Sequence, residues 1–170
     1  MPAIQDIPDA LFEETITRAV QEVFSTMLGK PAVPVPLDAC VAADTLSLDL
    51  PHVVGTVGFI GAINGLMYLY LDADFAQQCA GNLLGLAPHE ISSLDDEAVN
   101  DAIGELTNMT VGTFKNQLSD RGFGCRLTIP SILRGSRFRI EPISSATRRI
   151  YRFDIGGRAL TADLLMQPGE

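Results

Sequence analysis

The sequence is poor in the residues that build disulfides and metal sites. Its three cysteines, Cys40, Cys79 and Cys125, are odd in number and too far apart for a CxxC pair. Its two histidines, His52 and His89, do not stand at the spacing of a zinc motif. The composition therefore predicts a protein of a reducing compartment, with no disulfide framework and no metal site.

Basic residues and long apolar runs are also scarce. Twelve Lys and Arg stand against 21 Asp and Glu, which gives a net charge of −9, and no basic cluster with interleaved aromatics could follow a nucleic-acid backbone. No apolar run reaches the ~20 residues of a membrane helix, and the first nine residues lack the basic and apolar segments of a signal peptide. We expect a cytoplasmic protein that binds neither nucleic acid nor membrane.

Several common catalytic motifs are missing. The chain has no GxSxG, no GxxxxGK[ST] and no GxGxxG, which argues against the usual hydrolase elbow, nucleoside triphosphate site and dinucleotide site. At 170 residues and 46% hydrophobic content, the chain is long and apolar enough for one domain with its own core. Residues 1–170 are therefore predicted to form a single domain.

The periodicity of apolar residues predicts two long helices and one shorter helix. The first long helix runs over Asp9–Leu28 and is stopped by Gly29 and Pro31. A shorter one begins at Asp72 or Asp74 and ends before Gly85. The second long helix is predicted over Leu94–Leu118, after Ser92 and Ser93, each of which precedes an Asp by three residues and resembles part of a capping box.

About six strands complete the expected fold. Alternating or β-branched apolar residues predict them at Val41–Leu50, Val53–Ile60, Gly65–Leu71, Arg137–Ile140, Ile150–Ile155 and Leu160–Met166, with Gly156 and Gly157 as a hairpin turn. The arginines near the end of the chain alternate along the last strands and are interpreted as a solvated face, with contact to another protein or in a dimer as the alternative: Arg134, Arg137, Arg139, Arg148, Arg149 and Arg152.

The two long helices share a sequence pattern. Ala19 to Gly29 and Ala102 to Gly112 both read A-[VI]-x-E-[VL]-x-[SN]-x-x-x-G. Either the chain consists of two related halves of a helix and a hairpin, or two amphipathic helices match by chance, since Ala, Val, Leu and Glu are common helix formers. Because glycine destabilises a helix interior, Gly104 and Gly112 are expected to allow close packing or the close approach of another backbone.

Glu105 and Asn108 are the candidate functional residues of the second long helix. Residues three or four apart share a helix face, so Asp101, Glu105, Asn108 and Gly112 form one strip opposite Leu106. Asn is unfavourable within a helix, which makes Asn108 notable. From spacing alone, an ordinary solvated helix surface is the preferred interpretation.

The segment Asp101–Gly112 resembles the signature helix of the CheC/CheX/FliY chemotaxis phosphatases, whose pattern is E-x-x-N with a Gly four residues later. The segments Thr26–Gly29, Gly58–Gly61 and Gly65–Leu69 are similar to that family as well, in the same order along the chain. The resemblance implies an α/β (α+β) domain with pseudo-twofold halves, in which long helices pack on the sheet.

The resemblance also implies a function. Asn108 would orient the water that attacks the aspartyl phosphate of a CheY-like receiver domain, and Glu105 would pair with the receiver's lysine. Asp101 and Gly112 would contact the partner. Mg²⁺ is expected on the receiver, and no cofactor is expected on this chain. Ser25 stands where a second centre, with Glu22, would need Asn, so one centre is expected, as in the CheX-like members, which form homodimers.

Two other functions remain open at this point. The chain could be a non-catalytic interaction or dimerisation domain of the same fold, because function resides in a site and not in a fold. It could also bind a small ligand in the groove between the long helices. The second alternative predicts a deep apolar pocket there, whereas the phosphatase hypothesis predicts an exposed strip around Asn108.

Overall fold

The structure, a computed structural model, describes residues 4, 7–36, 47–48 and 50–169. Its helices are α1 (Asp9–Leu28), α2 (Ala73–Leu83), α3 (Pro88–Ile91) and α4 (Asp96–Ser119). Its strands are β1 (Ala32–Val35), β2 (Ser47–Leu48), β3 (His52–Gly61), β4 (Ile63–Asp72), β5 (Cys125–Leu127), β6 (Ser131–Gly135), β7 (Phe138–Arg139), β8 (Thr147–Ile155) and β9 (Arg158–Pro168).

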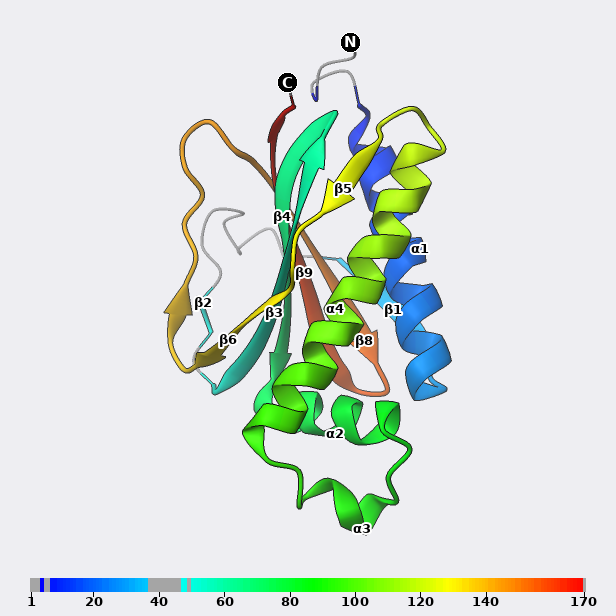
Figure 1. Ribbon diagram of the computed structural model, residues 1–170, viewed down its shortest axis with the longest axis vertical. Helices are drawn as coiled ribbons and strands as arrows, with labels where there is room; N and C mark the ends of the chain where they lie inside the picture. Colours follow the sequence, from blue (N-terminus) through cyan, green and yellow to red (C-terminus); the bar gives the residue numbers. More distant parts are fainter. Residues whose placement is uncertain (1–3, 5–6, 37–46, 49, 170) are drawn as a thin grey trace.

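Seven strands form one antiparallel sheet in the order β1-β8-β9-β4-β3-β5, with β6 also paired to β3. The long helices α1 and α4 lie on one face of this sheet and α2 lies at one end (Figure 1). A second, two-stranded sheet pairs β2 with β7. The predicted α/β (α+β) class is confirmed, with more strands than the six expected.

The strand order also agrees with the idea of two halves. The first half contributes α1, β1, β3 and β4, and the second contributes α4, β5, β6, β8 and β9. The pairing of β4 with β9 lies at the centre, and each half places its first strands beside the other half: β1 beside β8, and β5 and β6 beside β3. The two halves therefore have matching topology.

The core lies between the helices and the sheet. Five phenylalanines are fully buried, and the rings of Phe59 on β3 and Phe114 on α4 lie 5.9 Å apart. Alternation along the strands sends Val53, Val57 and Phe59 toward the helices, because successive side chains of a strand point to opposite faces. This layer fixes how α4 lies on the sheet.

Some predicted elements need correction. Of the strand predicted at Val41–Leu50, residues 41–46 and 49 lie outside the described part of the chain, and 47–48 form β2.

The predicted capping box is wrong, because Ser92 is the residue that ends α3. The N-cap of α4 is Asp95, whose side chain accepts a hydrogen bond from the Ala98 N–H at 2.9 Å. The Gly156-Gly157 turn is confirmed, since both residues have positive φ (60° and 84°) as the hairpin turn requires.

Candidate functional site on helix α4

Helix α4 presents the predicted strip on its outer face. Its buried residues are Val99, Ala102, Ile103, Gly104, Leu106, Thr107, Thr110, Val111, Phe114 and Leu118. Asp101 and Glu105 are exposed, and Asn108 and Gly112 are partly exposed. The helix therefore turns its apolar side to the sheet and leaves all four predicted residues on the accessible side.

A close contact with β3 fixes the rotation of α4. Gly55 lies against the Thr107 side chain so closely that a Cβ on Gly55 would overlap the Thr107 Oγ1 atom. That hydroxyl donates to the Ile103 carbonyl at 2.6 Å, one turn earlier in the helix. Because Thr107 faces the sheet, its neighbours Glu105 and Asn108 are turned away from it.

Glu105 and Asn108 are available for contacts with another molecule. Across the described ranges, the structure gives neither side chain a hydrogen bond or an ion pair within the chain. Residues three apart on a helix bring their Cβ atoms within about 5–6 Å of each other. A carboxylate and a carboxamide thus lie side by side with their polar atoms unpaired.

The glycines of α4 do not serve close packing within the chain. A Cβ on Gly104 would be 4.0 Å from Ile132 and Pro130, and a Cβ on Gly112 would be 4.0 Å from Leu127, which are ordinary contacts. The expectation that packing inside the chain requires these two glycines is therefore wrong. At Gly112, which is partly exposed, the close approach of another molecule stays a prediction.

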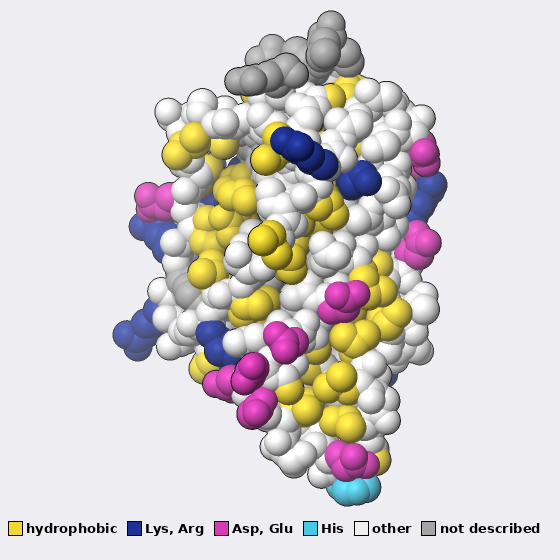
Figure 2. Space-filling view, in the orientation of Figure 1, with side chains coloured by type: hydrophobic (Ala, Val, Ile, Leu, Met, Phe, Trp, Pro, Cys, Tyr) yellow, Lys and Arg dark blue, Asp and Glu magenta, His cyan; other side chains and the backbone are white. Residues whose placement is uncertain are grey.

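An open groove of about 470 Å³ runs between α1 and α4 beside the strip. It is lined by Glu22, Val23, Thr26 and Met27 from α1 and by Asn108, Met109, Gly112, Thr113 and Asn116 from α4. Acidic side chains follow the N-terminal half of α4 on this face, and apolar side chains gather between α4 and α1 (Figure 2). The groove has a polar rim and is not the deep apolar pocket that the small-ligand alternative predicts.

A family model described as the chemotaxis phosphatase CheX matches residues 53–154, which include all of α4. The chain belongs to the CheX family. The CheY-P phosphatase CheX of Thermotoga maritima is 30% identical to it over 95 residues, which cover 55% of this chain and 59% of that protein. This CheX-family chain therefore matches about three-fifths of the length of that relative.

Solved structures show the same fold. A chemotaxis protein CheX from Desulfovibrio desulfuricans is similar with a TM-score of 0.76 and 22% identity, over 92% of this chain and 99% of that one. A chain of the CheX-CheY-BeF3-Mg²⁺ complex from Borrelia burgdorferi is similar with a TM-score of 0.70 and 19% identity, over 92% and 97%. The likeness supports the CheC-like architecture that the sequence predicts.

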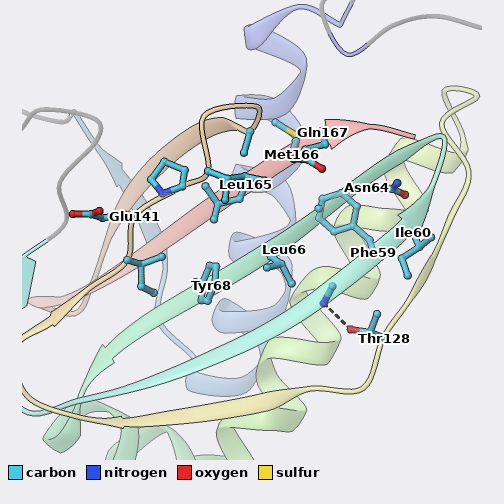
Figure 3. Close-up of a pocket in the computed structure, with 16 residues that line it drawn as sticks. Phe59, Ile60, Asn64, Leu66, Tyr68, Thr128, Glu141, Leu165, Met166 and Gln167 are labelled. Carbon is cyan, nitrogen blue, oxygen red and sulfur yellow. Dashed lines mark hydrogen bonds between the residues drawn. The ribbon is translucent and has the colours of Figure 1, made fainter. Parts of the chain in front are cut away.

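The opposite face of the sheet holds a second hollow in this CheX-family protein. Its volume is about 530 Å³, and Leu66 and Tyr68 of β4 and Leu165 of β9 lie at its base (Figure 3). The segment that leads into β8, with Pro142 and Ile143, lines its other side. The larger apolar hollow thus lies away from α4.

A buried charged cluster on that same face was not predicted. Arg148 donates from Nε to Asp163 Oδ1 at 2.9 Å and from Nη2 to Oδ2 at 2.6 Å, and the Tyr70 hydroxyl donates to Oδ2 at 2.9 Å. The side chains of Arg148 and Asp163 are 3% and 0% exposed. The interpretation of Arg148 as part of a solvated face is therefore wrong.

The cluster also holds a loop against the sheet. Arg148 Nη1 donates to the Ile140 carbonyl at 3.1 Å, and Ile140 packs on Tyr70 and Val54. Burial, and then the neighbouring Asp163 carboxylate, raise the pKa of Tyr70, which keeps its hydroxyl protonated as a donor. Sequence alternation could not reveal this, because it does not show which residue of the neighbouring strand β9 lies beside Arg148.

Two general features bear on cofactors and membranes. Within the described ranges, no three His, Cys, Asp or Glu side chains are grouped so that they could hold a metal ion. None of the described helices is both long enough and apolar enough to cross a membrane.

Proposed function

We propose that this chain hydrolyses the aspartyl phosphate of a CheY-like receiver domain. Two comparisons support the proposal: the family match, and the CheX-CheY complex formed by a structural neighbour from another organism. The observation that carries it is the pair formed by Glu105 and Asn108, which lie together on the accessible side of α4 without partners in the described chain.

In the proposed mechanism, Asn108 enters the active site of the receiver. Its carboxamide can donate and accept hydrogen bonds at once, so it orients a water molecule in line with the phosphorus atom. Glu105 pairs with the receiver's lysine and holds the two proteins in register. The receiver supplies Mg²⁺, and this chain needs no cofactor and no covalent intermediate.

The strip on α4 leaves room for the surface of another protein to contact it. Gly112 adds no side chain one turn after Asn108, and Asp101 adds a carboxylate one turn before Glu105. Neither residue is needed for the chemistry. Both are proposed as contacts to the receiver.

The test is a dephosphorylation time course with a phosphorylated CheY receiver and Mg²⁺. Positioning of the attacking water is worth on the order of 10²-fold in rate, so Asn108→Ala should lose that much activity and keep the stability of wild type. Glu105→Ala should lose activity mainly through a higher KM. If wild-type protein binds the receiver and does not accelerate dephosphorylation, the chain is the non-catalytic interaction domain considered above.

We also propose that the chain forms a homodimer, as the CheX-like resemblance implies. The sheet ends in β1 on one side, where Val33 is 51% exposed, and an open strand edge can pair with another strand. Light scattering after size exclusion would show a mass of twice 18.3 kDa for a dimer. A single-chain mass at micromolar concentration would contradict it.

A further inference from the structure

The groove between α1 and α4 has a carboxylate on the wall opposite Asn108. Glu22 and Thr26 line the groove from α1, and Asn108 and Gly112 line it from α4. No Lys or Arg is among its lining residues. Glu22 is therefore the charged side chain among the described residues that line the groove beside Asn108.

Among the residues that the structure describes, the Glu22 carboxylate has no cationic partner, because Arg18 of the same helix pairs with Glu14. Arg18, one turn earlier, donates to Glu14 at 3.1 Å, although Glu22 stands at the same spacing on its other side. The Thr26 hydroxyl donates to the backbone carbonyl of Glu22 and not to its carboxylate. In the described part of the chain, the exposed Glu22 carboxylate has no hydrogen bond or ion pair.

A receiver that reaches Asn108 must cover more than one helix strip. Stable protein interfaces bury about 800 Å² on each partner, so the contact extends sideways from α4. Toward α1, the contact would reach the half-buried side chains of Met27 on α1 and Met109 on α4. These two side chains offer apolar area beside the polar strip. This is the composition of a protein interface, with an apolar centre and a charged rim.

We infer that Glu22 is a positioning residue for the same receiver domain, and that it pairs with a Lys or Arg beside the receiver's phosphorylation pocket. The inference rests on the proposed function. Ser25 stands where the repeated pattern has Asn108 on α4, so α1 lacks an amide at that position, and α1 takes part in docking and α4 in chemistry. An exposed rim charge acts mainly on encounter and on salt dependence, which gives Glu22 a signature of its own.

The experiment compares Glu22→Gln with Glu13→Gln. Glu13 is an exposed carboxylate of the same helix, nine residues earlier and therefore about half a turn around the axis. Both variants lose one negative charge. Glu22→Gln should raise KM, and the Kd for a CheY receiver activated with BeF3 and Mg²⁺, by about 3- to 10-fold at low salt with kcat unchanged, and Glu13→Gln should match wild type.

Salt and a conservative variant sharpen the result. The difference between Glu22→Gln and wild type should shrink between about 50 mM and about 500 mM salt, because the interaction is screened. Glu22→Asp should recover part of the loss. A Glu22→Gln variant with wild-type KM and Kd, or with a change confined to kcat, overturns the inference.

Failure of the inference is separable from failure of the proposed function. If Asn108→Ala retains wild-type activity, the proposed function falls whatever Glu22 does. If Asn108→Ala is inactive and Glu22→Gln equals Glu13→Gln, only the docking role of α1 falls. If Glu22→Gln instead weakens self-association in light scattering, a second copy of this chain occupies the groove and the inference is again overturned.

Discussion

Gly112 is the residue whose proposed role in docking can best be tested separately from its effect on folding. A methyl group there meets nothing nearer than 4.0 Å within the chain, and alanine favours a helix by about 0.5–1 kcal/mol over glycine. Gly112→Ala should therefore raise the free energy of unfolding by that amount, measured with urea. The same variant should raise KM for the phosphorylated receiver, because the methyl group stands where the partner approaches.

Gly104→Ala is the matched control for Gly112→Ala. Gly104 lies on the same helix with equal room for a Cβ, but it is buried on the side of the sheet. It should bring a similar gain in stability and no change in KM. Equal KM values for Gly112→Ala and wild type would remove Gly112 from the docking surface.

The pair formed by Arg148 and Asp163 leads to a prediction about stability. Removing one charge of a buried pair leaves the other uncompensated and costs about 3–5 kcal/mol. Asp163→Asn should lower the free energy of unfolding by that amount in urea titrations. Glu141→Gln, which breaks the exposed contact with Arg139 at 2.9 Å, should cost less than about 1 kcal/mol. A loss for Asp163→Asn as small as the one for Glu141→Gln would contradict the structural role of the cluster.

At the scale of elements, the contact between β3 and α4 sets the position of the strip. A Cβ on Gly55 would overlap the Thr107 side chain, so Gly55→Ala forces α4 away from the sheet. Such overpacking costs about 1–3 kcal/mol, and thermal unfolding should report it as a lower Tm. Gly104→Ala, where the added atom fits, should show no such loss, and a Gly55→Ala protein as stable as wild type would show that α4 tolerates the shift.

The elements with strong periodicity could be predicted from the sequence. The first long helix is confirmed with the predicted ends Asp9–Leu28, and the Asp72 cap of α2 accepts from the Phe75 N–H at 2.8 Å. Strands β1, β5 and β6 and helix α3 were missed. Strand β1 is short and contains Pro34, which argues against a strand, and β5 and β6 are too exposed to show an apolar pattern.

The candidate site was predictable only in part, for a physical reason. The strip of Asp101, Glu105, Asn108 and Gly112 depends on local helix geometry, which the sequence pattern reports directly. The opposite wall with Glu22 depends on how α1 packs against α4, and this contact joins residues more than 80 positions apart. Local patterns carry no information on such a contact.

The molecule as a whole should lose stability at alkaline pH. Burial raises the pKa of Cys79 from 9.0 to about 12 and that of Tyr151 from 10.0 to about 12, and it raises the pKa of Tyr70 as well. Above the unfolded pKa values the unfolded chain releases protons that the folded protein retains, so the folded state binds more protons and its stability falls as pH rises. Below about pH 9 these groups should leave stability unchanged.

Urea titrations at several alkaline pH values test this prediction. The free energy of unfolding should be level up to about pH 9 and should then decline. Tyr151→Phe removes one of the titrating groups and should flatten the decline. Stability that stays constant to about pH 11 would contradict it.

The strand order ties the two halves of the chain together. Strand β1 pairs with β8, which follows more than 110 residues later, and one side of β3 pairs with β5 and β6 from beyond α4. If the backbone were cut in the connection between α2 and α4, each fragment would lack neighbours for its strands. Neither piece could then complete its sheet in isolation, and the mixed fragments would have to reassemble as one interleaved unit.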